Sequence, residues 1–155
     1  MTIEKGSRLI LPLRKLEDGP YGAPVARTLD LDAHGNGPIG IWHRAVTSSA
    51  EACLLLDREA RVVAASAAVG TVLGTTSGSA VGARFVDLVT AVDFTSGAEP
   101  DAELARSMPP LRALATGGLA RGLLRLRSAA GLTTYDVVAV PLSGSSGALA
   151  FFLAV

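Results

Sequence analysis

The clearest pattern of apolar and polar positions in this chain begins near its middle. Four apolar residues, Cys53–Leu56, are followed by a charged turn, Asp57–Arg61, and by a second apolar run, Val62–Ala65. Short apolar runs bounded by turn residues are typical of β-strands. The pattern therefore predicts a tight β-hairpin, and the Ala- and Val-rich residues after Ser66 predict a small helix.

Two other stretches have helical spacing. Apolar side chains four residues apart predict a short helix over Trp42–Glu51. Further along, Phe85, Leu88 and Val89 fall at positions i, i+3 and i+4, which places them on one side of a helical turn. Both segments therefore have an apolar side that can pack against a sheet.

The best-marked helix follows Ser107. Its hydroxyl can cap the first backbone donors, Pro109 suits a first helical turn, and Leu111 and Leu114 give the segment an apolar side. The pair of glycines that begins at Gly117 favours a left-handed helix end. We therefore predict a helix between these two signals.

The remainder of the chain predicts three strands. Arginines alternate mainly with apolar residues over 121–127. By contrast, Leu132–Leu142 is mostly apolar on both sides and Ala148–Val155 is apolar throughout. A strand that is apolar on both faces is usually covered on both faces, and a strand with charges on one face fits a sheet edge. The arginine-bearing strand should therefore lie at the edge.

Length and composition indicate one domain preceded by an arm. A chain of 155 residues can bury a substantial core. Ten of the first forty residues are Gly or Pro, which predicts an arm over 1–41 and a domain over 42–155. The arm is partly apolar, so we expect it to cover either its own sheet or that of a neighbouring subunit.

Charge and hydropathy exclude several classes of protein. The 14 basic and 14 acidic residues cancel, which disfavours a nucleic-acid partner. The longest apolar run is Ala148–Val155, much shorter than the roughly 20 residues of a membrane span. No signal peptide is evident, so we expect a cytoplasmic protein. Arg is strongly preferred over Lys, as in proteins of GC-rich bacteria.

No metal or covalent chemistry is indicated. Asp30, Asp32 and Gly35 have the spacing of the first half of a calcium-binding loop, but Ile41 occupies the position that needs a bidentate carboxylate. We therefore expect a polar turn there and no metal. The single cysteine, Cys53, lies in an apolar strand, where a packed thiol is expected.

The order of these elements resembles a PAS domain over about two-thirds of the chain, from about Ala50 to Val155. The similar segments are CLLLDREARVVAAS, AAVGTVLG, VGARFVDLV, the helix ending at Gly117-Gly118, and YDVVAVPLSGSSGALAFFLAV. Ser66 stands where many PAS domains have Asn. The resemblance implies an α+β fold: a five-stranded antiparallel sheet of order 2-1-5-4-3 with small helices on one face.

The resemblance also disfavours two cofactors. PAS domains that form a flavin photoadduct need a Cys in the helical region, but Cys53 lies in the first predicted strand. Haem-binding members need an axial His in that region, but His34 and His43 precede it. We therefore expect neither flavin nor haem.

A set of apolar residues is expected between sheet and helices. These residues are Phe85, Leu88, Leu111, Leu114, Leu124, Leu126, Tyr135 and Val137. Two interpretations stay open: they fill the core, or they line a pocket for a small apolar ligand.

The resemblance implies a non-catalytic sensory or protein-interaction module that acts as a homodimer or through an output protein of unknown identity. The apolar rear face of the predicted sheet, which a partner could cover, supports that hypothesis. The alternative is a small enzyme acting on a hydrophobic substrate, with Asp87, Asp93 or Asp136 beside Tyr135 as acid or base. No catalytic constellation is evident, so we expect no enzymatic activity.

Overall fold

The computed structural model describes residues 38–94, 101–143 and 146–155. The turn predicted over Asp30–Asn36 and the rest of the predicted arm up to residue 37 lie outside these residues. The division of the chain into an arm and a domain at residues 41 and 42 stays a prediction.

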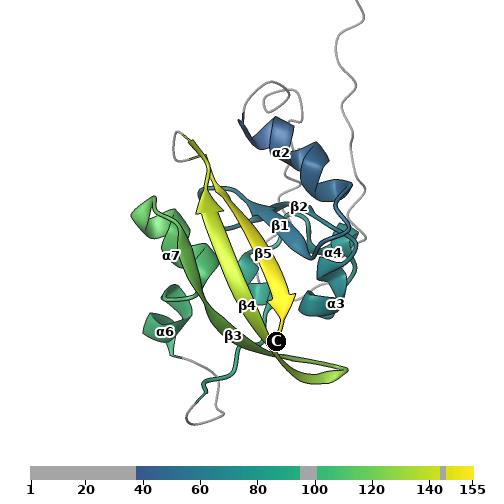
Figure 1. Cartoon of the computed structure of the whole chain (residues 1–155), viewed down its shortest axis with the longest axis vertical. Coiled ribbons are helices and arrows are strands. Elements are labelled where there is room, and N and C mark those ends of the chain that lie inside the picture. Colours follow the sequence, from purple (N-terminus) through teal and green to yellow (C-terminus); the bar gives the residue numbers. More distant parts are fainter. Residues whose placement is uncertain (1–37, 95–100, 144–145) are drawn as a thin grey trace, which may run out of the picture.

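Six short helices and five strands make up the described part of the chain (Figure 1). The helices are α2 (Pro38–Thr47), α3 (Val69–Leu73), α4 (Ser77–Ala80), α5 (Phe85–Leu88), α6 (Ala102–Arg106) and α7 (Pro109–Thr116). The strands are β1 (Cys53–Leu56), β2 (Val62–Ala65), β3 (Ala120–Ser128), β4 (Gly131–Pro141) and β5 (Ala148–Ala154).

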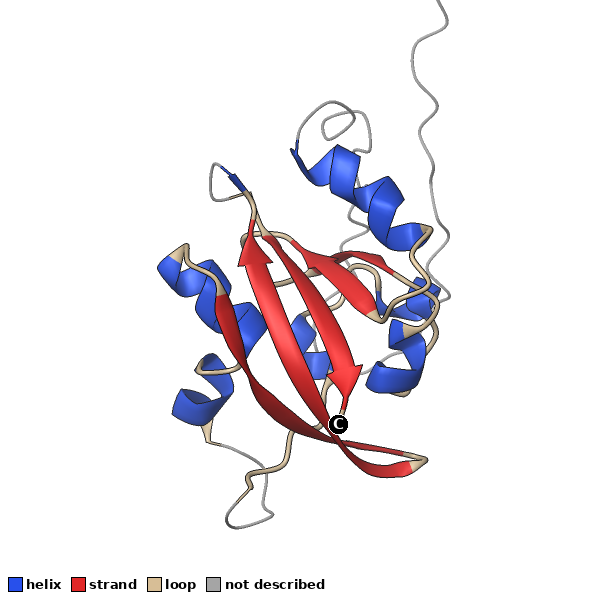
Figure 2. Cartoon of the chain, in the orientation of Figure 1, coloured by secondary structure: helices blue, strands red, loops and turns tan. Residues whose placement is uncertain are grey.

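All five strands form one sheet of order β2-β1-β5-β4-β3, and every pairing is antiparallel (Figure 2). The last strand therefore lies beside the first: Phe151 of β5 pairs with Cys53 of β1 on one side and with Val138 of β4 on the other. The predicted fold class and strand order are confirmed. The arginine-bearing strand, β3, lies at the edge as expected.

The charged turn of the first hairpin is held by its aspartate. The Oδ1 atom of Asp57 accepts hydrogen bonds from the backbone N–H groups of Glu59 (3.0 Å) and Arg61 (2.9 Å). Ala60 adopts a positive φ of 59°, which lets the chain reverse over so few residues. The polar run that signalled a turn in the sequence therefore closes β1 onto β2.

One face of the sheet, which we call the inner face, packs against α3, α5 and α7. Leu54 and Leu56 of β1, Val137 of β4 and Phe152 of β5 join Phe85 of α5 in a single buried cluster. These strand residues occupy alternate positions, as expected where one face of a pleated strand meets a helical layer. This cluster is the main core of the domain.

Among the described residues, the opposite, outer face is covered at one end, by α2. Helix α2 lies against β1 and β2 (Figure 1), and its Ile39 and Val46 pack with Cys53, Leu55 and Leu149. All four residues of β1 are therefore buried. Cys53 is buried and not disulfide-bonded, as expected for a packed thiol.

Three helix boundaries differ from the sequence-based expectations. Helix α2 spans Pro38–Thr47 and not Trp42–Glu51, so it begins within the predicted arm. At its end the Ser49 N–H donates to the Val46 carbonyl oxygen (3.1 Å), a tighter turn than the helical pattern. Helix α7 has Met108, not Ser107, at its N-cap, without a side-chain cap. Its end is as predicted: Gly117 has φ of 66° and its N–H donates to the Ala113 carbonyl oxygen.

Ser66 joins the first hairpin to α3. It is fully buried, and its Oγ accepts hydrogen bonds from the backbone N–H groups of Cys53 (3.0 Å) and Val69 (3.3 Å). Its own N–H donates to the Cys53 carbonyl oxygen (3.0 Å). One hydroxyl therefore satisfies two buried donors, one in the sheet and one at the start of α3.

We predict that Ser66→Ala lowers the free energy of unfolding by about 1–3 kcal/mol, because it leaves those two buried donors without an acceptor. Urea denaturation monitored by circular dichroism measures the change. The control is Ser79→Ala, which removes an exposed hydroxyl and should change stability by less than about 0.5 kcal/mol. Equal effects of the two substitutions would contradict the assigned role.

Gly147, just before β5, touches the backbone of β1. Its φ is 154°, and a Cβ at this position would overlap the Leu56 carbonyl oxygen. Its own carbonyl oxygen accepts a hydrogen bond from the Leu142 N–H (2.8 Å). The close approach of β5 to β1 therefore requires a residue without a side chain.

We predict that Gly147→Ala lowers the free energy of unfolding by about 2 kcal/mol or more, because backbone atoms must shift to admit the methyl group. Gly78→Ala, in α4, meets no atom within 4 Å and should be neutral or stabilising by up to about 1 kcal/mol. Thermal unfolding of both variants distinguishes the two sites. An unchanged melting temperature for Gly147→Ala would refute the contact.

Candidate functional site

All eight residues predicted to lie between sheet and helices are found there. Phe85, Leu124, Leu126 and Val137 are buried in the main core. The remaining four, which are Leu88, Leu111, Leu114 and Tyr135, are partly buried and pack against it. The structure therefore brings the whole predicted set together on the inner face.

Phe152 of β5 belongs to the same group but was not among the predicted residues. Its ring lies 6.4 Å from that of Phe85 and 6.3 Å from that of Tyr135, and the second contact is edge-to-face. Because β5 is apolar at every position, its sequence gives no period-2 signal to show which face each side chain occupies. Only the pairing with β1 and β4 places Phe152 on the inner face.

Two cavities in the described residues each include only one member of the predicted set. One of about 240 Å³ is lined by Leu124 and another of about 450 Å³ by Leu114. The inner-face residues are therefore packed against one another in this structure. Their role in binding a ligand stays a prediction.

The outer face carries an apolar surface that α2 does not cover. We call it the outer patch and define it as Leu123, Val138, Val140, Phe151 and Leu153. Leu123 and Leu153 are 54% and 63% exposed, and Val140 and Phe151 are 37% and 39% exposed. Strand register joins the patch between β4 and β5, because Phe151 lies opposite Val138 and Leu149 lies opposite Val140. Leu123 of β3 is separated from Leu153 of β5 by Asp136, which lies opposite both of them.

The sequence predicted that β5 would be covered on both faces, and this is true for only part of the strand. Leu149 is buried beneath α2 and Leu142, but Phe151 and Leu153 are exposed. Helix α2 packs mainly on β1 and β2 and reaches β5 only at Leu149. An apolar stripe of this kind is typical of a surface that contacts another protein.

An ion pair interrupts the outer patch, since Asp136 lies between Leu123 and Leu153 on the same face. The Nε atom of Arg121 lies 3.0 Å from Oδ1 of Asp136, and Nη2 of Arg121 also donates to this carboxylate. The hydrogen bonds from Arg121 hold the pKa of Asp136 below its usual value, and the same pairing raises the pKa of Arg121. Asp136 is therefore ionised at neutral pH and faces away from the core, on the opposite face from Tyr135.

The arrangement does not resemble a catalytic or metal centre. Asp87 is exposed on α5, and Asp93 lies beside the edge strand β3. Within the described ranges no three His, Cys, Asp or Glu side chains are grouped so that they could hold a metal ion. Nor is any described helix long and apolar enough to cross a membrane. The outer patch is the most distinctive surface for a function based on contact.

Comparison with solved structures gives several similar folds. A PAS domain from Colwellia psychrerythraea matches with a TM-score of 0.54 and 19% identity, covering 76% of this chain and 96% of its own. A PAS domain of a LuxR-family transcriptional regulator from Burkholderia thailandensis, in complex with ethanol, matches with a TM-score of 0.50 and 11% identity, covering 72% and 95%. These likenesses are to the fold.

A third similar structure is the VqmA dimer of Vibrio cholerae, with a TM-score of 0.50 and 16% identity. The match covers 70% of this chain and 48% of the VqmA chain. No curated protein sequence matched the chain.

A family model described as the PAS fold matches residues 46–155, which is more than half of the chain. The match includes all five strands and the helices of the inner face. The chain therefore belongs to the PAS family of sensory and signalling domains.

Proposed function

We propose that this PAS domain is a non-catalytic sensory module that signals by forming a homodimer through its outer patch. The observation that carries the proposal is the exposed apolar side chains of β4 and β5, namely Val140, Phe151 and Leu153, with Leu123 of β3 on the far side of Asp136. A symmetric dimer would bury the same patch on both subunits. The similar VqmA structure is described as a dimer, which supports the proposal by analogy.

The patch needs neighbouring residues to make a stable interface. A stable interface buries about 800 Å² on each partner, more than five partly exposed side chains can supply. Helix α2 adds Ile41 and Trp42, which are 60% and 40% exposed. Because α2 itself packs on the outer face, we infer that these two side chains extend the contact surface.

We propose that the input to this module is a small apolar molecule bound among the inner-face residues. The eight predicted side chains and Phe152 gather there, and a similar PAS domain binds ethanol. Binding would require α5 and α7 to separate slightly from the sheet, since the residues are in contact. We also propose a cytoplasmic, bacterial setting, on the basis of composition.

The state of Asp136 weighs against the enzymatic alternative. A carboxyl group that moves protons near neutral pH needs a raised pKa, as burial in an apolar site would produce. The pKa of Asp136 is lowered, chiefly by hydrogen bonds from Arg121, and its carboxylate faces outward. Asp136 and Tyr135 therefore do not form an acid–base pair.

The ion pair makes a prediction about pH. Because the pKa of folded Asp136 lies below its unfolded value, the pair contributes stability at neutral pH and loses it as pH falls through the folded pKa. We expect Asp136→Asn to lower the melting temperature at pH 7 and to have a progressively smaller effect as pH falls below about 3.9, the usual pKa of an unfolded Asp. Glu51→Gln, at an exposed site, is the control. A pH-independent effect of Asp136→Asn would argue against the pair.

We predict that the purified protein is a dimer at micromolar concentration and that Phe151→Glu or Leu153→Glu makes it a monomer, because each places a charge in the apolar contact. Sedimentation equilibrium measures the change, and native mass spectrometry reports oligomeric state and any co-purified small molecule together.

The matched control for this prediction is Val86→Glu. Val86 is 39% exposed, as is Phe151, but it lies on α5 in the helical layer. This variant should remain dimeric. The proposal is wrong if the wild-type protein is a monomer, or if both Phe151→Glu and Leu153→Glu remain dimeric.

A further inference from the structure

The edge of β3 is only partly paired. At one end, the Val92 N–H donates to the Arg125 carbonyl oxygen (2.8 Å) and the Arg127 N–H donates to the Thr90 carbonyl oxygen (2.9 Å). At the other end, Nη2 of Arg112 donates to the Arg121 carbonyl oxygen (2.8 Å). The odd-numbered residues of β3 therefore direct their backbone groups away from β4.

Leu123 lies between these two paired positions. Its backbone N–H and carbonyl oxygen point outward from the sheet, and within the described residues no group hydrogen-bonds to either. A strand edge with an unpaired donor and acceptor can accept another extended chain. Val92 is the last residue of the described segment that hydrogen-bonds to β3, so no described strand pairs with the edge at Leu123.

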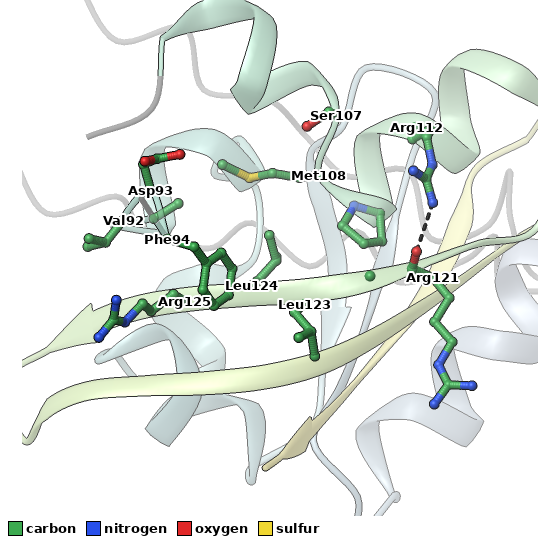
Figure 3. A pocket seen from close by; sticks show the side chains of 13 residues that line it. Val92, Asp93, Phe94, Ser107, Met108, Arg112, Arg121, Leu123, Leu124 and Arg125 are labelled. Carbon is green, nitrogen blue, oxygen red and sulfur yellow. Dashed lines mark hydrogen bonds between the residues drawn. The ribbon is translucent and has the colours of Figure 1, made fainter. Parts of the chain in front are cut away.

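A cleft of about 240 Å³ runs along this gap. Figure 3 shows Phe94, Met108 and Leu124 around it, while the side chain of Leu123 points to the other side of β3. The floor is apolar because it continues the inner face of the sheet. The cleft therefore has room for one large apolar side chain of a chain paired with β3.

The outer face of the same edge is positively charged. Arg121, Arg125 and Arg127 occupy alternate outer-face positions of β3. Arg121 already pairs with Asp136 of the neighbouring strand, which shows that a carboxylate on an adjacent strand can reach this row. Arg125 lies 5.9 Å from the centre of the Phe94 ring, and no acidic side chain of the described residues forms an ion pair with it.

This charge pattern distinguishes between two chains that could pair with the edge: a second copy of β3 and a chain with acidic residues. If two copies of β3 paired antiparallel about Leu123, Arg121 of each would lie opposite Arg125 of the other, and like charges directly opposite destabilise a strand pair. A chain with acidic residues on the outer face and apolar residues on the inner face would instead complement both the arginine row and the cleft.

We propose that the free edge of β3 between Arg121 and Arg125 binds an extended acidic segment of a partner protein as a sixth strand. The partner alternates acidic and apolar residues and places one apolar side chain in the cleft beside Phe94. The edge site uses the backbone of Leu123, whereas the outer patch uses its side chain, so the two surfaces adjoin at this residue.

Fluorescence anisotropy with two labelled eight-residue peptides tests the proposal. One peptide alternates glutamate and valine, and the other alternates lysine and valine. We expect the full chain to bind the acidic peptide about tenfold more tightly, as several cross-strand charge pairs would give. Added salt should weaken this binding. If neither peptide binds at millimolar concentration, the arginines serve only to keep the edge unpaired and the proposal is wrong.

Two substitutions separate strand pairing from general attraction. Leu123→Pro removes the outward N–H, a substitution that the edge of a sheet tolerates, and should weaken peptide binding at least about tenfold. Leu123→Ala keeps the N–H and should bind the peptide within about threefold of wild type. Arg125→Glu should reverse the peptide preference, while Arg58→Glu, the same charge change in the β1–β2 turn, should not. If Leu123→Pro does not fold, the reversed peptide preference of Arg125→Glu tests the edge site by itself.

The two proposals fail separately. Peptide binding is measured again with Leu153→Glu, which targets the outer patch alone. If Leu153→Glu still binds the acidic peptide and is still a dimer, only the role of the outer patch is refuted. Unaltered binding by Leu123→Pro, or an unchanged preference in Arg125→Glu, refutes the edge site whatever the oligomeric state.

Discussion

The structure depends on the insertion of the last strand between the first and the fourth. β5 forms seven cross-strand pairs with β4 and four with β1, and it joins two hairpins that are far apart in sequence. Without it, β1–β2 and β3–β4 would be separate two-stranded units, which are marginally stable in water. The contact of Gly147 with the β1 backbone and the burial of Phe152 both follow from this insertion.

A strand that is apolar on both faces creates two surfaces that must be covered. The inner face is covered by short helices, and the packing of Phe85, Tyr135 and Phe152 closes it. Within the part of the chain that the structure describes, the outer face is covered only where α2 lies, which leaves the outer patch exposed around the Arg121–Asp136 pair. The exposed apolar surface is therefore a direct consequence of how β5 is placed, since the same apolar sequence that stabilises the sheet is left partly in solvent.

The edge strand contrasts with the central strand. β3 carries arginines on its outer face, and two copies of it paired antiparallel would place like charges opposite each other. The apolar side chains of β5 and the charged side chains of β3 thus give the same face of the sheet two different chemistries.

Much of the fold could be predicted from local patterns. The hairpin at Asp57, the helix end at Gly117 and the edge position of the arginine-bearing strand depend on residues close in sequence, and each was found as expected. Helix starts were less well predicted: Ser107 is a good cap by type, but the chain begins α7 after Met108, whose side chain is buried.

By itself, the sequence determined which segments form strands and helices and which of them are apolar enough to be buried, because these properties follow from local spacing and residue type. Only the tertiary structure decided which side chains of the uniformly apolar β5 face the helices, where α2 stops covering the sheet, and which part of the β3 edge is unpaired. The physical reason is that these features depend on register and on contacts between residues distant in sequence, and an all-apolar strand carries no alternation that would reveal them.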